Sequence, residues 1–201
     1  IKQVRYYYLL SNKVLSLISF PIFFGIAATA PNFVPLLIGG KWEQAIVPLQ
    51  ILALVVPFRV LSLGTQAMFQ GLGKPEINTQ NLLVAVIFTP VCMLIGINYG
   101  IAGAALGWSV GFIIYFVFIV IKTMKVLQFS KKTYLLDISI PLVLSLSMFI
   151  FLININHNEF TTNNLYLLMV KVIVGFIFYG GLLIILGRKR FVIPLISLLR
   201  K

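Results

Sequence analysis

Arg59 is the residue of this chain best placed to do chemistry, because it interrupts a long stretch that is otherwise uncharged. It lies about midway along an apolar segment, roughly 20 Å from either end at 1.5 Å per residue. Three polar residues follow it on the same helical face, at i+3, i+7 and i+11, namely Ser62, Gln66 and Gln70. We expect this stripe to line an aqueous cavity in which Arg59 binds an anionic group such as phosphate. The alternative is a structural role, with Arg59 bound to backbone carbonyls.

Lys171 is the second cation inside an apolar segment, about seven residues from the start of the last one. Its stem is expected to carry the ammonium outward to the nearer membrane surface. A second phosphate contact is the alternative. Gly175 and Tyr179 share its helical face and leave room for a cavity.

The chain offers little for catalysis. Cys92 is its only cysteine, His157 is its only histidine, and no carboxylate lies within an apolar segment. Because paired acids, a Ser/His pair and a metal cluster are all missing, we expect no enzyme activity, no cofactor and no metal. The missing embedded acids also argue against a proton or sodium site in this part of the protein, and against export of cationic drugs.

The composition is that of a polytopic membrane protein. Of the 201 residues, 60% are hydrophobic and only 10% are charged, whereas soluble domains are about 45–50% apolar and about 25% charged. One core cannot bury so much apolar surface, which excludes a soluble enzyme. The net charge of +12 is spread along the chain, so we expect contact with anionic lipid and no nucleic-acid partner.

The charges divide the chain into lengths of about 20 apolar residues, each enough for one membrane crossing. We therefore predict an all-α membrane domain over residues 14–187, with a cytoplasmic loop at 1–13 and a basic cytoplasmic tail at 188–201. The six predicted spans are 14–38, 45–72, 78–97, 101–121, 138–155 and 165–187. With the N-terminus inside, the outer segments carry a single basic residue, Lys41. The positive-inside rule then places both ends in the cytoplasm.

Glycine and proline indicate how these spans pack. Gly103, Gly107 and Gly111 repeat every four residues and predict a close approach by a neighbouring helix. Prolines bend or break several spans, which suits a transporter that rocks between two states. They are Pro21, Pro31, Pro35, Pro48, Pro57, Pro90 and Pro141.

About half of the chain resembles a known family. The pattern begins at Phe20-Pro21, continues through Gly39-Gly40-Lys41-Trp42 and Leu49-Gln50-Ile51-Leu52-Ala53-Leu54 to Arg59, and includes Gly71-Leu72-Gly73-Lys74-Pro75 and Tyr99-Gly100-Ile101-Ala102-Gly103. It resembles the bacterial polysaccharide flippases of the multidrug/oligosaccharidyl-lipid/polysaccharide exporter superfamily.

The resemblance implies a transporter of 12 to 14 helices in two lobes, of which this chain is most of the second. It further implies a multi-pass protein of the bacterial inner membrane that moves a polyprenyl-diphosphate-linked oligosaccharide outward by alternating access. Polysaccharide polymerases or glycosyltransferases are the expected protein partners. Two alternatives remain open: a drug or small-molecule exporter of the same superfamily, and a membrane scaffold for polysaccharide assembly enzymes that transports nothing.

Overall fold

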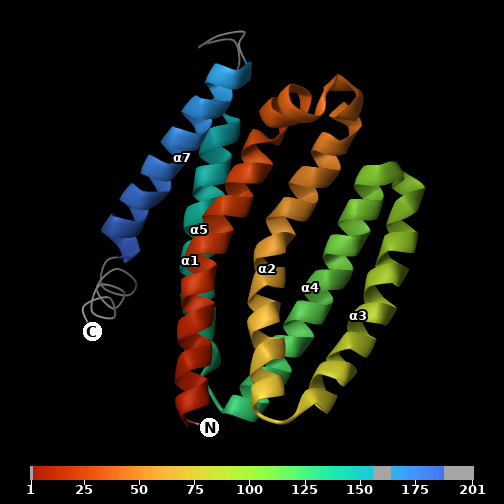
Figure 1. Cartoon of the computed structure of the whole chain (residues 1–201), viewed down its shortest axis with the longest axis vertical. Coiled ribbons are helices and arrows are strands. Elements are labelled where there is room, and N and C mark those ends of the chain that lie inside the picture. Colours follow the sequence, from red (N-terminus) through yellow and green to blue (C-terminus); the bar gives the residue numbers. More distant parts are fainter. Residues whose placement is uncertain (1, 156–163, 188–201) are drawn as a thin grey trace.

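The computed structural model describes residues 2–155 and 164–187, and this part of the chain contains six long α-helices (Figure 1). Five continuous helical segments are long and apolar enough to cross a membrane, and one of them, Pro75–Leu127, is the hairpin of α3 and α4. The fold is therefore all-α and polytopic, as predicted. The helices are α1 Lys2–Phe33, α2 Ile46–Gly71, α3 Pro75–Gly96, α4 Gly100–Leu127, α5 Lys131–Ile153 and α7 Asn164–Gly187.

Short connections join these helices. A π-helical turn at Val34–Ile38 and a 3-10 turn at Gly40–Ala45 connect α1 to α2. Gly73, with φ of +67°, reverses the chain between α2 and α3. Between the predicted spans 78–97 and 101–121 the chain forms a 3-10 turn at Ile97–Tyr99, followed by Gly100 with φ of +77°. Glycine adopts these left-handed conformations without the steric cost of a Cβ atom.

Several helices extend beyond the spans that the charges predict. α1 begins at Lys2, so residues 2–13 are helical, although we expected a loop there. α4 continues to Leu127 and α5 begins at Lys131, which leaves residues 128–130 as the connection. Charged residues end an apolar segment, but Lys, Arg and Gln are good helix formers, so a helix continues through them. The predicted tail at 188–201 lies outside the described residues.

α1 is the central helix of the described part. It packs against α2, α5 and α7, while α4 packs against α2 and α3, so α7 and α3 lie on opposite sides of α1 and α2 (Figure 1). Phe58 of α2 connects the two groups, because its ring centroid lies 5.2 Å from that of Phe20 on α1 and 5.2 Å from that of Phe116 on α4. Edge-to-face contacts of this kind add to the energy of burial.

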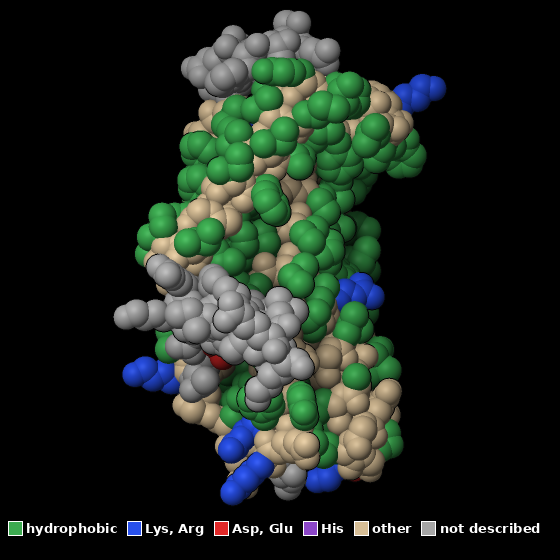
Figure 2. Space-filling view, turned by 60° about the vertical axis from the view of Figure 1, so that its left-hand side comes forward, with side chains coloured by type: hydrophobic (Ala, Val, Ile, Leu, Met, Phe, Trp, Pro, Cys, Tyr) green, Lys and Arg blue, Asp and Glu red, His purple; other side chains and the backbone are tan. Residues whose placement is uncertain are grey.

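Charge and apolar surface are separated along the long axis of the molecule. Figure 2 shows hydrophobic side chains over most of the upper and middle surface, with most Lys and Arg side chains in the lower half. The lower end holds the start of α1 and the α2–α3 and α4–α5 connections (Figure 1). At the other end, the connection from α1 to α2 carries Lys41 and Glu43. This asymmetry is the one that the positive-inside rule uses.

The predicted close approach of a helix to the glycine series is confirmed, and the neighbour is α3. A Cβ atom built on Gly107 would collide with the backbone carbonyl of Cys92, and one built on Gly103 would collide with that of Gly96. A Cβ atom on Gly111 would lie 2.7 Å from Cα of Thr89. The obstacle at each position is backbone, which cannot rotate away. Small residues are therefore required along this face of α4.

Replacing Gly107 with alanine should therefore destabilise the protein by about 1–3 kcal/mol, the usual cost of forcing atoms into a packed interface. The measurement is thermal unfolding of the purified full-length protein in detergent. Gly180→Ala on α7 is the matched control, because nothing lies within 4 Å of its added Cβ atom. Equal stability of the two variants would show that α3 and α4 do not approach as described.

Three prolines in these helices free a backbone carbonyl that a different helix then caps. Proline has no N–H group, so the carbonyl four residues before it loses its helical donor. The Tyr179 hydroxyl on α7 donates to the Leu17 carbonyl at 3.0 Å, four residues before Pro21. In hydrocarbon such a carbonyl has no water to bind, which makes a protein donor necessary.

The other two capped carbonyls are those of Ala27 and Asp137. Gln50 Nε2 on α2 donates to the Ala27 carbonyl at 2.9 Å, four residues before Pro31. Ser16 Oγ on α1 lies 3.3 Å from the Asp137 carbonyl, four residues before Pro141, and shares its proton with the Lys13 carbonyl of its own helix. All three hydrogen bonds join α1 to a neighbour. For Pro57 and Pro90, no side chain caps the freed carbonyl within the described residues.

A double-mutant cycle should measure the cap at Pro31. Gln50→Met keeps the length of the side chain but removes the donor, and should cost about 0.6–1.7 kcal/mol, the range for hydrogen bonds between membrane helices. In a Pro31→Ala background the restored backbone N–H can bind the Ala27 carbonyl, so the same substitution should cost close to nothing. Thermal unfolding of the four proteins gives the coupling. Equal costs in the two backgrounds would contradict the cap.

Candidate functional site

Arg59 lies near the middle of α2 and its side chain is exposed. Within the described residues, its guanidinium makes no hydrogen bond or ion pair. The structural alternative, in which Arg59 binds backbone carbonyls, is therefore not seen in this part of the chain. A cation at this depth without a partner is expensive in hydrocarbon, so it needs water or an anion.

The other three residues of the polar stripe differ in their surroundings. Gln70 is exposed like Arg59, and both residues lie on one face of α2. Gln66 is half-buried at the edge of that face, with Nε2 3.4 Å from the Tyr115 hydroxyl of α4. Ser62 is buried, and its hydroxyl donates to the Arg59 carbonyl at 2.7 Å. Arg59 and Gln70 are thus the most accessible members of the stripe.

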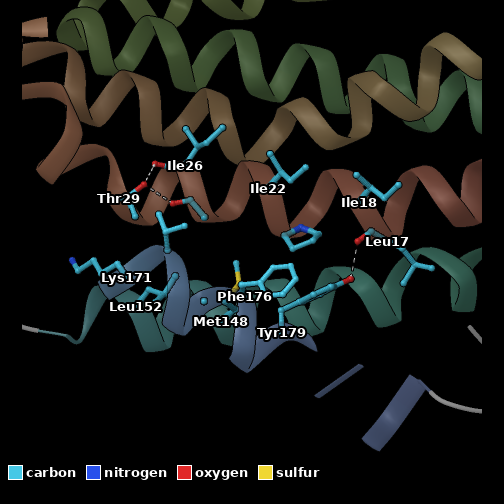
Figure 3. Close-up of a pocket in the computed structure, with 14 residues that line it drawn as sticks. Leu17, Ile18, Ile22, Ile26, Thr29, Met148, Leu152, Lys171, Phe176 and Tyr179 are labelled. Atoms are coloured by element: carbon cyan, nitrogen blue, oxygen red, sulfur yellow. Dashed lines mark hydrogen bonds between the residues drawn. The ribbon is translucent and has the colours of Figure 1, made fainter. Parts of the chain in front are cut away.

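Lys171 lies in a different place, beside a cavity of about 450 Å³ between α1, α5 and α7 (Figure 3). Gly175 and Tyr179 also line this cavity, as their shared helical face predicts. At Gly175 the helices α7 and α5 pack closely, because a Cβ atom there would lie 3.1 Å from the Leu152 side chain. The Lys171 side chain itself is buried, with 6% of its surface exposed.

The structure does not bring Lys171 and Arg59 together. The cavity beside Lys171 is lined by α1, α5 and α7, and no residue of α2 contributes to it. In Figure 1, α1 lies between α7 and α2. A single phosphate cannot bind both cations in this arrangement, so they belong to separate sites.

Sequence reasoning missed the residues that cap the proline-freed carbonyls and the tyrosine that holds Gln66. The acceptors were predictable, because each lies four residues before a proline. The donors Gln50, Tyr179 and Ser16, and Tyr115 beside Gln66, come from helices whose pairing the sequence does not reveal. No group of three or more His, Cys, Asp or Glu side chains able to hold a metal ion occurs among the described residues.

Comparison with known proteins gives the family. A family model described as "Polysaccharide biosynthesis protein" matches residues 1–47. The lipopolysaccharide biosynthesis protein WzxC of Escherichia coli (strain K12) is 32% identical over 148 residues, which are 72% of this chain and 29% of that protein. An uncharacterized membrane protein in the cps region of Klebsiella pneumoniae is 31% identical over 98 residues, 48% of this chain and 20% of that protein. The chain belongs to the polysaccharide biosynthesis family of membrane proteins.

This polysaccharide biosynthesis protein spans less than a third of the length of either relative. No solved structure is significantly similar to it. The role of the exposed face of α2 must therefore be inferred from its own chemistry. The Arg59 guanidinium, which has no partner among the described residues, and the exposed Gln70 amide lie on one side of this helix.

Cysteine labelling tests whether this face is wet. In a full-length protein whose native cysteines are replaced by serine, Arg59→Cys should react in intact membranes with a small, charged thiol reagent, because we expect the face to line an aqueous cavity. Leu83→Cys on α3 is the control, since Leu83 is 59% exposed on an apolar helix and should face lipid. Labelling of both positions, or of neither, would contradict an aqueous cavity at Arg59.

Proposed function

We propose that this chain forms most of one lobe of a flippase that moves a polyprenyl-diphosphate-linked oligosaccharide across the bacterial inner membrane. The function is transport and not catalysis, so no covalent intermediate forms. The family supports a role in polysaccharide biosynthesis. The transport activity and the substrate rest on the chemistry of the α2 face.

The observation that carries the proposal is the exposed Arg59 at mid-helix without an anionic partner in the described part of the chain. A diphosphate carries negative charge and pairs of acceptor oxygens, and a planar guanidinium binds such a pair with two parallel hydrogen bonds. Gln70 and Gln66 on the same side of α2 supply amides suited to hydroxyl groups of a sugar. The apolar lipid tail would remain in the bilayer, so it would need no binding site on this face of α2.

The proposed mechanism is alternating access. Binding of the diphosphate by Arg59 offsets the cost of moving its charge away from water, and the lobe then exposes the same site to the other side. The carbonyls freed by Pro21, Pro31 and Pro141 give α1 and α5 points where a helix bends with few backbone hydrogen bonds to break. α1 packs against α2, α5 and α7, so a bend there would move the whole lobe.

The proposed orientation places the lower end of Figure 1 in the cytoplasm. Lys2, Arg5, Lys74, Lys125 and Lys131 all lie at or near that end of the helices. A basic surface favours the cytoplasmic side and its anionic lipids. Lipid-linked sugars made on that side would then meet the Arg59 face from the cytoplasm.

Substitution of Arg59 tests the proposal in cells. Arg59→Ala in the full-length protein should reduce surface polysaccharide at least about tenfold and cause lipid-linked precursor to accumulate, because a charge-assisted contact of about 1.5–3 kcal/mol is lost. Arg59→Lys should recover only part of the export, since an ammonium lacks the planar fork. Export and protein abundance are measured in the same membranes.

Lys125→Ala is the matched control, because it removes an exposed cation from the last turn of α4. It should leave both export and abundance unchanged. Normal export by a normally abundant Arg59→Ala protein would overturn the binding role. A loss of export that only follows a loss of protein would instead assign Arg59 a structural role.

A further inference from the structure

The cavity between α1, α5 and α7 is a second site, separate from the Arg59 face. Most of its lining is apolar, with Ile22 on α1, Met148 on α5 and Phe176 on α7 among the contributing side chains (Figure 3). Its lining residues on α1 run from Leu17 to Thr29, roughly 18 Å at 1.5 Å per residue. One leaflet of a bilayer has a hydrocarbon thickness of about 15 Å, half of the usual 30 Å. The cavity is therefore as long as one lipid chain in one leaflet.

Three polar side chains line this cavity, and two of them are already satisfied. The Thr29 hydroxyl donates to the Gly25 carbonyl of its own helix at 2.9 Å. The Tyr179 hydroxyl donates to the Leu17 carbonyl. The Lys171 ammonium has no hydrogen-bond or ion-pair partner among the described residues, and only 6% of the residue's surface is exposed.

Lys171 lies at one end of the cavity. In Figure 3 its side chain extends away from Tyr179, toward the end at which Thr29 lies. No Asp or Glu lines the cavity, so an anion that pairs with Lys171 must come from outside the described part of the chain. An unpaired ammonium in an apolar wall is costly, and a phosphate is its natural partner in a membrane.

We propose that this cavity binds an anionic phospholipid of the bilayer, with its phosphate on Lys171 and one acyl chain along α1 between Leu17 and Thr29. The long apolar lining of the cavity matches the acyl chain of such a lipid, and the single cation at one end matches its phosphate. Lys171 lines the cavity and extends toward its Thr29 end, where a lipid phosphate can reach the ammonium. The proposal does not depend on what the Arg59 face transports.

The lipid serves as a packing element for α7. Gly175 lets α7 approach Leu152 of α5 closely, and the bound acyl chain fills the cavity that these two helices form with α1. Apolar contacts with the acyl chain would then stabilise the position of α7, because a ligand that binds only the folded state stabilises that state. Removal of the lipid should loosen α7 before it loosens the other helices.

Binding to lipids of matched chain length tests the proposal. The full-length protein, stripped of lipid in detergent and prepared from cells that lack the lipid-linked glycan, is titrated with phosphatidylglycerol or phosphatidylcholine, and bound lipid is counted by native mass spectrometry. The wild type should bind phosphatidylglycerol about tenfold more tightly than phosphatidylcholine, because the choline of the latter opposes Lys171. Lys171→Met, which keeps the stem but removes the charge, should lose this preference.

Lys125→Met is the matched control, since it removes an exposed cation away from the cavity and should keep the preference. Ile22→Trp narrows the cavity without touching Lys171, and should reduce binding of both phospholipids about equally. An unchanged preference in Lys171→Met would overturn the proposal. So would tight, Lys171-dependent binding of a polyprenyl diphosphate together with no binding of phosphatidylglycerol, because the occupant would then be the transported lipid.

Discussion

The constraint on which this structure depends is that a backbone carbonyl inside a membrane must find a donor within the protein. α1 and α5 break their own helical ladder at Pro21, Pro31 and Pro141, and side chains from neighbouring helices repair each break. Apolar contacts discriminate little between helices in lipid, because lipid tails are as apolar as leucine. The three caps therefore specify which helices meet α1, and they explain why α1 lies at the centre of the lobe.

This arrangement of helices places two cationic side chains, one exposed and one buried. Arg59 is exposed on α2 on one side of α1, whereas Lys171 is buried beside α7 on the other side. An accessible guanidinium suits a ligand that binds and leaves, such as a transported diphosphate. A buried lysine at the end of an apolar cavity suits a ligand that stays. Under the two proposals, the chain separates a surface for transport from a site for a resident lipid.

Much of this fold could be predicted from the sequence, because lengths of about 20 apolar residues between charges leave little choice. The long apolar helices of the described residues, the close contact of Gly107 and the cavity beside Gly175 follow from spacing alone. The ends of α1 and α4 do not, because a charge marks the end of an apolar segment and not the end of a helix. A sequence that is apolar on every face also hides which helices pack together, so the donors Gln50 and Tyr179 were not predictable.

Transport of a lipid-linked oligosaccharide is the central claim, and movement of that lipid in vesicles measures it most directly. The full-length protein is reconstituted into sealed vesicles that hold a polyprenyl-diphosphate-linked oligosaccharide in the inner leaflet, and an impermeant glycosidase outside reports arrival in the outer leaflet. The account predicts protein-dependent cleavage of more than half of the labelled lipid, and strong inhibition by an added polyprenyl diphosphate. Cleavage at the rate of protein-free vesicles, by a protein that remains folded and correctly inserted, would contradict it.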